Sequence, residues 1–408
     1  MRKIQFFFGI FIVIFFGGCQ VDTPTTLTLV PPDSGVEDST VAPQQQARIP
    51  VLVMPGMFGS MSADLLEGKK KYVHAMESAL AYVDKKFPGM LCGTKIPTQW
   101  KIDPIRCTYD TLIAALEDAN HLVWTFPYDW RDAPDTLAPY LDAQVRALAA
   151  YSDDGTIAVV AHSYGGLVLR ACMQQGLCAA VRKAVFVGTP HHGTVEAYYL
   201  YGGEATGSAG EVMLKEALLS VMKWAQIGTD VSALFNGNIG TGPSVFDYRY
   251  VQTYMPSVGK LTPVFDYIRR WNVLTKTATP VAYTELCRHN VWLENLNANA
   301  SALFAQGAEV LNIVGTDTPT TKEILVRDLG VVPCKARTRW PNGDPQSVLL
   351  LNAPQRNWKV DGDGVVTQAS AAFPAGSGTV QHVRNTKKHR KLVMNKEVHE
   401  RIAEFLDN

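Results

Sequence analysis

One serine in this sequence stands where a nucleophile would be exposed. Ser163 lies in IAVVAHSYGGLV at residues 157–168, where an apolar run meets small-X-Ser-X-Gly and then a helical pattern. Such a sharp turn exposes the hydroxyl, and it needs small neighbours such as Ala161 and Gly165 because strand and helix approach closely. The helix dipole and the backbone N–H of Tyr164 favour an oxyanion there. We therefore predict a serine nucleophile, the alternative being a serine that only caps the helix.

A glycine-rich turn earlier in the chain offers further hydrogen-bond donors to the same site. The segment PGMFG at residues 55–59 follows an apolar, strand-like run. Gly56 and Gly59 allow the backbone to bend, so the N–H of Met57 or Phe58 can face the serine and hold an oxyanion. A glycine turn without such a role is the alternative.

A serine nucleophile also needs a base, and six histidines follow it in the chain. The base is expected between the last strand and the closing helix. Residues 379–383 are strand-like, and residues 395–406 have an amphipathic helical pattern. His389 lies between them, whereas His382 falls within the strand and His399 within the helix. We therefore predict that His389 is the base.

Basic residues surround His389, at positions 384, 387, 388, 390 and 391. Their charge disfavours a second positive charge on the imidazole, which helps to keep the ring neutral and basic. They also offer contacts to anionic lipid, the alternative being an ordinary solvated loop.

Two acidic segments compete to orient the histidine. Asp317 follows an apolar run at residues 310–314, while Asp361 and Asp363 lie in VDGDGVV at residues 360–366. The acid must accept the imidazole N–H, which demands reach rather than a fixed chain position, so these residues alone leave Asp317 and Asp363 open. A DxDG turn also suggests calcium, but the other ligands of an EF-hand loop are missing, and CxxC spacing for zinc is absent. We expect no metal site.

The elements that must position these residues alternate along the chain. Strand-like runs lie at residues 49–54, 121–126, 156–161 and 184–187, and helical patterns at 109–119, 137–150 and 165–173. This alternation predicts a mainly parallel sheet with helices on both faces. Continuous hydrophobicity within the runs fits strands that are buried on both sides.

The composition describes a globular chain without a broad charged surface. The chain has 408 residues, 47% hydrophobic and 19% charged, and 38 Lys and Arg balance 38 Asp and Glu. The length suits one large domain or two ordinary ones. A net charge of zero excludes the basic field that nucleic-acid binding requires.

The N-terminus has the pattern of an export signal. Two basic residues precede a largely apolar run at residues 4–16, and a Gly-Gly pair then precedes Cys19. The run is shorter than the roughly 20 residues that a spanning helix needs. It resembles a bacterial lipoprotein signal, which implies a signal peptide at residues 1–18, lipid on Cys19 and a membrane anchor. An ordinary signal with an incidental cysteine is the alternative.

Two features after the cleavage point concern location and flexibility. By resemblance to Gram-negative lipoproteins, Gln20 implies an outer-membrane location, facing the periplasm or the cell exterior. Residues 19–47 are rich in Thr, Pro, Ser and Gln, which predicts a disordered tether.

Five motifs and one histidine follow one another in a characteristic order: PGMFG at 55–59, PYDWR at 127–131, AHSYGG at 161–166, GTPHHG at 188–193, GDGVV at 362–366 and His389. Together they resemble the lecithin:cholesterol acyltransferase-like branch of the α/β-hydrolases, from about residue 50 to 406. The resemblance implies an α/β-hydrolase fold without a cofactor. It also implies the following site: the triad Ser163, Asp363 and His389, with oxyanion donors at Met57 and Tyr164. It favours Asp363 over Asp317, although Val365 stands where the family has Thr and Ala161 where Gly is usual.

The same resemblance implies an activity on lipid esters. A serine hydrolase of the lipase or phospholipase kind would cleave acyl esters through an acyl-enzyme. One alternative is an O-acyltransferase that passes the acyl group to a sterol or another alcohol. Another is a non-enzymatic lipoprotein that only binds lipid.

The middle of the chain departs from the alternating pattern. Residues 195–307 contain helical, apolar stretches, so we expect a helical cap or lid there, inserted between core segments 48–194 and 308–408. Six cysteines remain after Cys19, in a compartment that permits disulfides. We predict the pairs Cys92–Cys107, Cys172–Cys178 and Cys287–Cys334.

Overall fold

The computed structural model describes residues 49–227, 248–272, 274–327, 339–345, 357–374 and 380–408, which belong to one compact unit, residues 47–408. The expected signal peptide, Cys19 and the whole expected tether lie outside the described residues. Within the part that is described, no helix combines the length and the apolar character that crossing a membrane requires.

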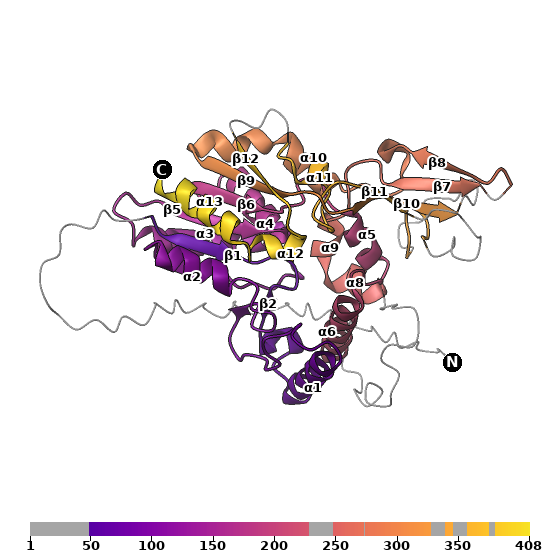
Figure 1. Cartoon of the computed structure of the whole chain (residues 1–408), viewed down its shortest axis with the longest axis horizontal. Helices are drawn as coiled ribbons and strands as arrows, with labels where there is room; N and C mark the ends of the chain where they lie inside the picture. Colours follow the sequence, from indigo (N-terminus) through magenta and orange to yellow (C-terminus); the bar gives the residue numbers. More distant parts are fainter. Residues whose placement is uncertain (1–48, 228–247, 273, 328–338, 346–356, 375–379) are drawn as a thin grey trace, which may run out of the picture. The chain divides into compact units, whose positions relative to one another are not determined.

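A parallel six-stranded sheet forms the centre of this unit, as the alternation predicts (Figure 1). Its strand order is β12-β9-β6-β5-β1-β4, and every neighbouring pair is parallel. The strands are β1 (Val51–Met54), β4 (Val123–Thr125), β5 (Ile157–His162), β6 (Val181–Val187), β9 (Glu309–Gly315) and β12 (Gln381–Asn385). Strand β5 is buried along its whole length, which explains its continuous apolar sequence.

Helices cover both faces of this sheet. One face packs its alternate residues, including Val160 and Ile313, against α2 (Asp110–Asp118) and α13 (Lys396–Asp407). Helices α3 (Pro134–Ala149) and α4 (Tyr164–Gln174) contact each other and β5. Because successive side chains of a strand point to opposite faces, each strand can serve two helical layers at once.

The segment at residues 195–307 is only partly helical. Its helices are α5 (Val195–Tyr201), α6 (Ala209–Ile227), α8 (Tyr248–Tyr254), α9 (Pro256–Lys260) and α10 (Val291–Ala298), with short 3-10 turns at Tyr283–Glu285 and Ala300–Gln306. It also holds β7 (Ile268–Asn272) and β8 (Thr277–Val281), which form a second sheet, β11-β10-β7-β8, with β10 (Thr320–Arg327) and β11 (Asn357–Val360). The second sheet therefore combines strands from the expected insertion with strands from the segment assigned to the core.

The remaining described elements are short or flank the central sheet. They are the antiparallel pair β2 (Ser60–Met61) and β3 (Lys101–Ile102), the turn η1 (Ala63–Leu66), and helices α1 (Lys70–Lys86), α11 (Gln368–Ala371) and α12 (His389–Leu392). Helix α1 packs against α6. The segment between β2 and β3 thus contacts the expected insertion through α1.

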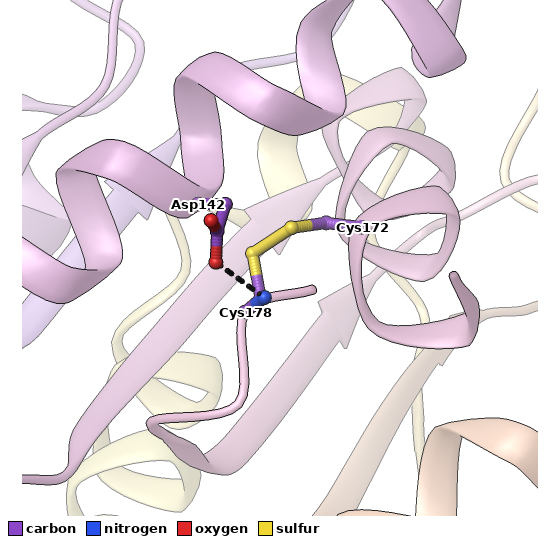
Figure 2. A group of neighbouring side chains, drawn as sticks. All are labelled: Asp142, Cys172 and Cys178. Carbon is purple, nitrogen blue, oxygen red and sulfur yellow. Dashed lines mark hydrogen bonds between the residues drawn. A yellow bond between two sulfur atoms is a disulfide. The ribbon is translucent and has the colours of Figure 1, made fainter. Parts of the chain in front are cut away.

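Two of the three predicted disulfides are confirmed, namely Cys92–Cys107 and Cys172–Cys178. Cys287 is also disulfide-bonded, and its predicted partner, residue 334, lies outside the described residues. Figure 2 shows the second disulfide beside Asp142, which accepts a 2.8 Å hydrogen bond from the backbone N–H of Cys178. These three residues lie within metal-binding distance of one another, but sulfurs bonded to each other are not the thiolates that bind zinc.

Helix α4 approaches β1 so closely that Gly165 has no room for a side chain. A Cβ atom there would lie 2.6 Å from the backbone oxygen of Pro55. We expect Gly165→Ala to lower the free energy of unfolding by about 1–3 kcal/mol, because backbone must move to relieve the contact. Urea denaturation measures this change.

The matched control is Gly259→Ala in α9, where the nearest atom is the flexible end of Arg288 at 3.1 Å. Alanine favours a helix relative to glycine, so this control should cost little or stabilise the protein. Equal losses in the two variants would contradict the close approach at Gly165.

Candidate active site

Ser163 occupies a strained turn between β5 and α4. Its backbone angles are φ 54° and ψ −121°, which a residue other than glycine rarely adopts. Its N–H donates to the carbonyl of Val187 at 2.9 Å, and its own carbonyl accepts from Gly166 at 3.0 Å. The sharp strand-to-helix turn expected from the sequence is present, and it exposes the hydroxyl to the cavity described below.

Three residues distant in sequence meet at this turn. The Oγ of Ser163 lies 2.8 Å from Nε2 of His389, and Nδ1 of His389 lies 2.7 Å from Oδ2 of Asp363. An ionised carboxylate only accepts hydrogen bonds, so Nδ1 carries the proton and Nε2 accepts from the serine hydroxyl. This is the arrangement that proton transfer from the serine requires.

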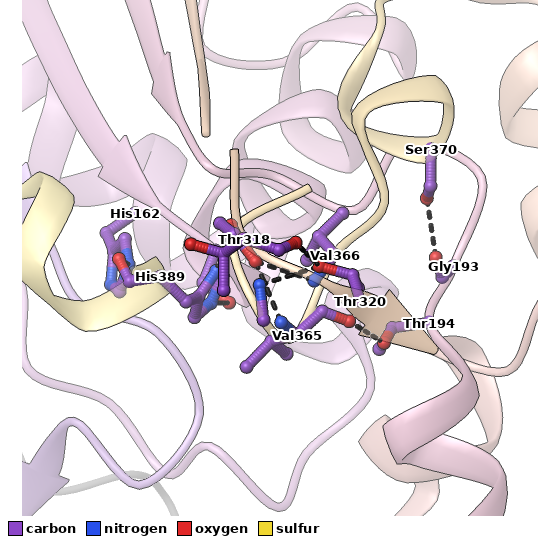
Figure 3. A network of polar contacts seen from close by, with 12 residues as sticks. His162, Gly193, Thr194, Thr318, Thr320, Val365, Val366, Ser370 and His389 are labelled. Atoms are coloured by element: carbon purple, nitrogen blue, oxygen red, sulfur yellow. Dashed lines mark hydrogen bonds and ion pairs between the residues drawn. The ribbon is translucent and has the colours of Figure 1, made fainter. Parts of the chain in front are cut away.

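The Asp363 carboxylate is held by its own turn. Its Oδ1 accepts from the backbone N–H groups of Val365 at 2.9 Å and Val366 at 2.7 Å, and its carbonyl accepts from the N–H of His389 at 2.9 Å. Figure 3 shows Val365, Val366 and His389 within one polar network. The Asp363 side chain is fully buried, so these bonds fix the oxygen that faces the imidazole.

The competing candidates from the sequence lie elsewhere. Asp317 is exposed, and the contacts of its side chain in the described part of the chain include the Thr316 hydroxyl and not His389. His382 is exposed on β12, and His399 is buried in α13 with Nε2 near the Val393 carbonyl at 2.8 Å. His389 itself is the first residue of the short helix α12 rather than part of an open loop.

The expected oxyanion donors have free N–H groups. Among the described residues, the backbone N–H groups of Met57 and Tyr164 have no hydrogen-bond partner, whereas the N–H of Gly56 donates to the Tyr109 hydroxyl at 2.9 Å. Met57 also lines the cavity that contains Ser163. An N–H held in place without a partner is what a developing negative charge requires.

The PYDWR motif fixes the turn that carries Met57. The Tyr128 hydroxyl donates to the Pro55 carbonyl at 2.6 Å, and the Trp130 indole N–H donates to the Ser60 carbonyl at 3.1 Å. Arg131 forms a bidentate ion pair with Asp129. The motif therefore supports the site through the turn and does not itself contain the nucleophile, acid or base.

A buried chain of hydrogen bonds links the 55–59 turn to the histidine. The Tyr109 hydroxyl lies 2.9 Å from Nδ1 of His162, and Nε2 of His162 lies 3.3 Å from the carbonyl of His389. Because the His389 carbonyl only accepts, a neutral His162 carries its proton on Nε2, and the Tyr109 hydroxyl donates to Nδ1 while it accepts from the N–H of Gly56. No sequence pattern marked Tyr109, and the only signal for His162 was its position beside the serine.

A cavity of about 520 Å³ opens over Ser163. The turn, the triad and the expected insertion all contribute to its wall, and the insertion supplies apolar residues at Ala197, Leu200, Leu214 and Leu218 from α5 and α6. Charged residues also line it, among them Arg106, Glu196, Lys215 and Arg390. The cavity thus has room and apolar surface for part of a lipid-sized ligand.

Comparison with known proteins bears on the fold. A family model described as alpha/beta hydrolase matches residues 121–204, which include Ser163. Together with the parallel six-stranded sheet, this match confirms the expected α/β-hydrolase fold. The match concerns the broad family, so the narrower lecithin:cholesterol acyltransferase-like branch stays a prediction. A search of curated proteins found no match.

The solved structures that match this chain in fold have low sequence identity to it. A lipase of Bacillus licheniformis, BlEst2 in mature form, is 11% identical with a TM-score of 0.40, covering 90% of this chain and 96% of that one. The lin2722 product of Listeria innocua is 12% identical with a TM-score of 0.34, covering 88% and 94%. The Tle4–Tli4 complex gives 10% identity and a TM-score of 0.49, covering 89% and 99%.

Burial of His162 makes stability depend on pH. Burial, and then the neighbouring His389, lower the pKa of His162 well below its usual 6.5. Below about pH 6.5, His162 therefore binds a proton in the unfolded chain but not in the folded one. The folded state consequently loses stability as the pH falls. We expect His162→Gln to make this loss shallower, by at most about 1.4 kcal/mol per pH unit.

Urea unfolding between about pH 4 and 7 measures the slopes. The control is His74→Gln, since His74 is exposed on α1. Parallel slopes for His162→Gln and the native protein would show that His162 is not held neutral by the fold.

Proposed function

We propose that this protein is a serine hydrolase that cleaves acyl ester bonds of lipids. The observation that carries the proposal is the unbroken chain of contacts from Ser163 through His389 to the buried Asp363, at the wall of a partly apolar cavity. The α/β-hydrolase fold agrees with it. The motifs that resemble the lecithin:cholesterol acyltransferase-like branch support a lipid rather than a small ester as substrate.

In the proposed reaction, Nε2 of His389 takes the hydroxyl proton as Oγ of Ser163 attacks the ester carbonyl carbon. The electron pair of the carbonyl bond moves to oxygen, where the N–H groups of Met57 and Tyr164 stabilise it. The bond to the leaving alcohol then breaks, and His389 returns the proton to that alcohol. Water repeats both steps on the acyl-enzyme and releases the fatty acid.

Asp363 serves the reaction by orientation and charge. Its Oδ2 holds the imidazole with Nδ1 protonated, and the negative charge stabilises the imidazolium that forms during each step. The two backbone N–H groups on Oδ1 keep the carboxylate in place while the histidine gains and loses its proton. Asp317, which makes no contact with His389 among those described, has no part in this mechanism.

Variants of the two aspartates separate the candidates for the acid. We expect Asp363→Asn to lower kcat on a p-nitrophenyl ester by about 10⁴-fold, since the amide favours the wrong imidazole tautomer. Asp317→Asn, the matched control, should leave kcat nearly unchanged. Ser163→Ala should abolish both hydrolysis and labelling by a fluorophosphonate probe.

Full esterase activity in Ser163→Ala would overturn the proposal, and a large loss in Asp317→Asn with none in Asp363→Asn would overturn the choice of acid. The same assay with labelled phospholipid, with and without an added long-chain alcohol, measures whether water or the alcohol receives the acyl group. Ester formation with the alcohol would indicate the acyltransferase alternative.

We also propose that the enzyme is anchored to a membrane as a lipoprotein. The support is in the sequence: a basic start, an apolar run at residues 4–16, and Cys19 after two glycines, followed by a polar tether. Several acyl chains, each burying about 0.8 kcal/mol per CH₂, hold a folded domain firmly on a bilayer. The neutral net charge agrees with attachment by lipid rather than by a basic surface.

Replacement of the cysteine tests the anchor. We expect the full chain expressed in a Gram-negative host to incorporate a radiolabelled fatty acid and to sediment with outer membranes. Cys19→Ala should lose the label and the membrane association, whereas Ser34→Ala in the tether should retain both. A label that persists in Cys19→Ala would refute this anchor.

A further inference from the structure

Two arginines line the cavity beside the reacting serine, and neither takes part in the proposed mechanism. Arg390 directly follows His389 in the chain, and Arg106 lies in the segment before the disulfide-bonded Cys107. Both side chains are partly buried, with 17% of the Arg106 side chain exposed. Charged groups in such a position need a partner, because burial removes the water that would solvate them.

The arginines have few partners within the protein. Among the described residues, the Arg390 side chain has no hydrogen bond or ion pair, and only Nε of Arg106 approaches an acid, at 3.6 Å from Asp103. The two guanidinium groups line the same cavity, so their like charges repel each other. Burial first, and then the charge of Arg106, lower the pKa of Arg390, and the nearby Asp103 and Glu211 offset this only in part. An anion between the groups would satisfy both and remove this repulsion.

Arg106 is held in place through its backbone. The N–H of Arg106 donates to Oδ1 of Asp103 at 3.3 Å, and the N–H of Asp103 donates to the Gly59 carbonyl at 2.9 Å. The disulfide between Cys92 and Cys107 closes the same segment. The backbone of Arg106 is thereby tied to the turn that carries Met57, so the fold fixes the point from which its side chain extends into the cavity.

The nearby carboxylates are largely used by other groups. Asp103 accepts from the Thr108 hydroxyl and from the Arg106 backbone. Glu211 accepts from the N–H of Ser208 at 2.9 Å and from its hydroxyl at 3.0 Å. Among the described contacts, neither acid forms a close ion pair with Arg390, and only Asp103 approaches Arg106, at 3.6 Å.

Two further acids of the cavity wall also leave the arginines unpaired. Glu204 forms an ion pair with Arg339 at 3.1 Å. Burial raises the pKa of Glu196 to about 7 despite the nearby Lys215, so this carboxyl is largely neutral in mildly acidic solution and only partly charged near pH 7.

Three lysines also line the cavity, but Lys388 and Lys391 are exposed and Lys215 donates to the Thr206 carbonyl at 2.8 Å. Among the cations of the described wall, Arg106 and Arg390 are thus the partly buried ones with no hydrogen bond from the side chain and no ion pair closer than 3.6 Å.

We infer that Arg106 and Arg390 form an anion subsite that binds the phosphate of a glycerophospholipid while Ser163 attacks one of its acyl esters. Guanidinium forks match the oxygens of a phosphodiester, whose single negative charge is shared by two non-bridging oxygens that both arginines can reach from different sides. In such a lipid the phosphate is only a few bonds from the esters, and Arg390 is only one residue from the base. The inference rests on the proposed hydrolase function and specifies its substrate class.

Matched soluble substrates test the subsite on the full-length protein. Dihexanoylphosphatidylglycerol and dihexanoylglycerol carry the same acyl esters, and only the first carries phosphate. The quantity to measure is the ratio of their kcat/KM values below the concentration at which micelles form. We expect Arg390→Gln and Arg106→Gln each to lower this ratio about 10- to 100-fold, mainly through KM, as the loss of a charged hydrogen bond predicts.

The control variant is Lys387→Gln, which removes a charge from the same exposed segment but does not line the cavity. It should leave the ratio unchanged, while Arg390→Lys, which keeps the charge but loses the fork, should recover part of the loss. An unchanged ratio in both Gln variants would overturn the subsite. A loss seen only on phosphatidylglycerol vesicles, and not on the soluble lipid, would assign the arginines to membrane contact instead.

Inorganic phosphate separates a headgroup site from a site for the free ion. Competitive inhibition of dihexanoylglycerol hydrolysis that Arg390→Gln relieves, together with a lowered ratio, supports the headgroup. Inhibition without any change in the ratio would mean that free phosphate is the ligand and would overturn the inference. If the native protein neither hydrolyses the two esters nor reacts with a fluorophosphonate, the hydrolase proposal itself fails.

Discussion

The strained backbone of Ser163 persists because the turn after β1 packs directly against the turn between β5 and α4. A side chain at Gly56 would place its Cβ 2.8 Å from that of Ser163, and one at Gly165 would meet the Pro55 carbonyl at 2.6 Å. Strand β5, helix α4 and the turn after β1 therefore meet with only backbone between them. This close approach puts the nucleophile and the free N–H groups within one small space, and a looser packing would let the strained turn relax.

The rest of the polar network keeps that space rigid. Tyr128 binds the Pro55 carbonyl of the 55–59 turn, and Trp130 binds the Ser60 carbonyl directly after it. Tyr109 and His162 connect the turn to the carbonyl of His389. Because each group is buried and has a partner, moving one would leave another unsatisfied at a cost of about 1–3 kcal/mol. The base and the oxyanion donors are thus coupled through the protein interior rather than positioned independently.

The segment at residues 195–307 joins the same rigid unit. Arg170 of α4 is fully buried and donates to the side chain of Asn297 at 2.9 Å and to the Leu296 carbonyl at 3.1 Å. Burial lowers its pKa to about 9, which still leaves it charged at neutral pH. The helix behind the nucleophile is therefore bound to α10, while α5 and α6 of the same segment line the cavity.

Local chemistry in the sequence determined the serine turn, the parallel sheet and the choice of His389, since each depends on residue type and spacing over short stretches. Tertiary packing determined the other features, because they depend on which distant side chains lie within contact distance of each other. Asp317 follows a strand-like run and Asp363 lies in an acidic glycine turn, both at plausible positions, and only the folding of residues 362–366 onto α12 brings one carboxylate to the imidazole. Likewise, β7 pairs with β10 although more than fifty residues separate them in the chain, and the distant Arg106 and Arg390 line one cavity. Such contacts depend on how distant segments pack, which no local pattern records.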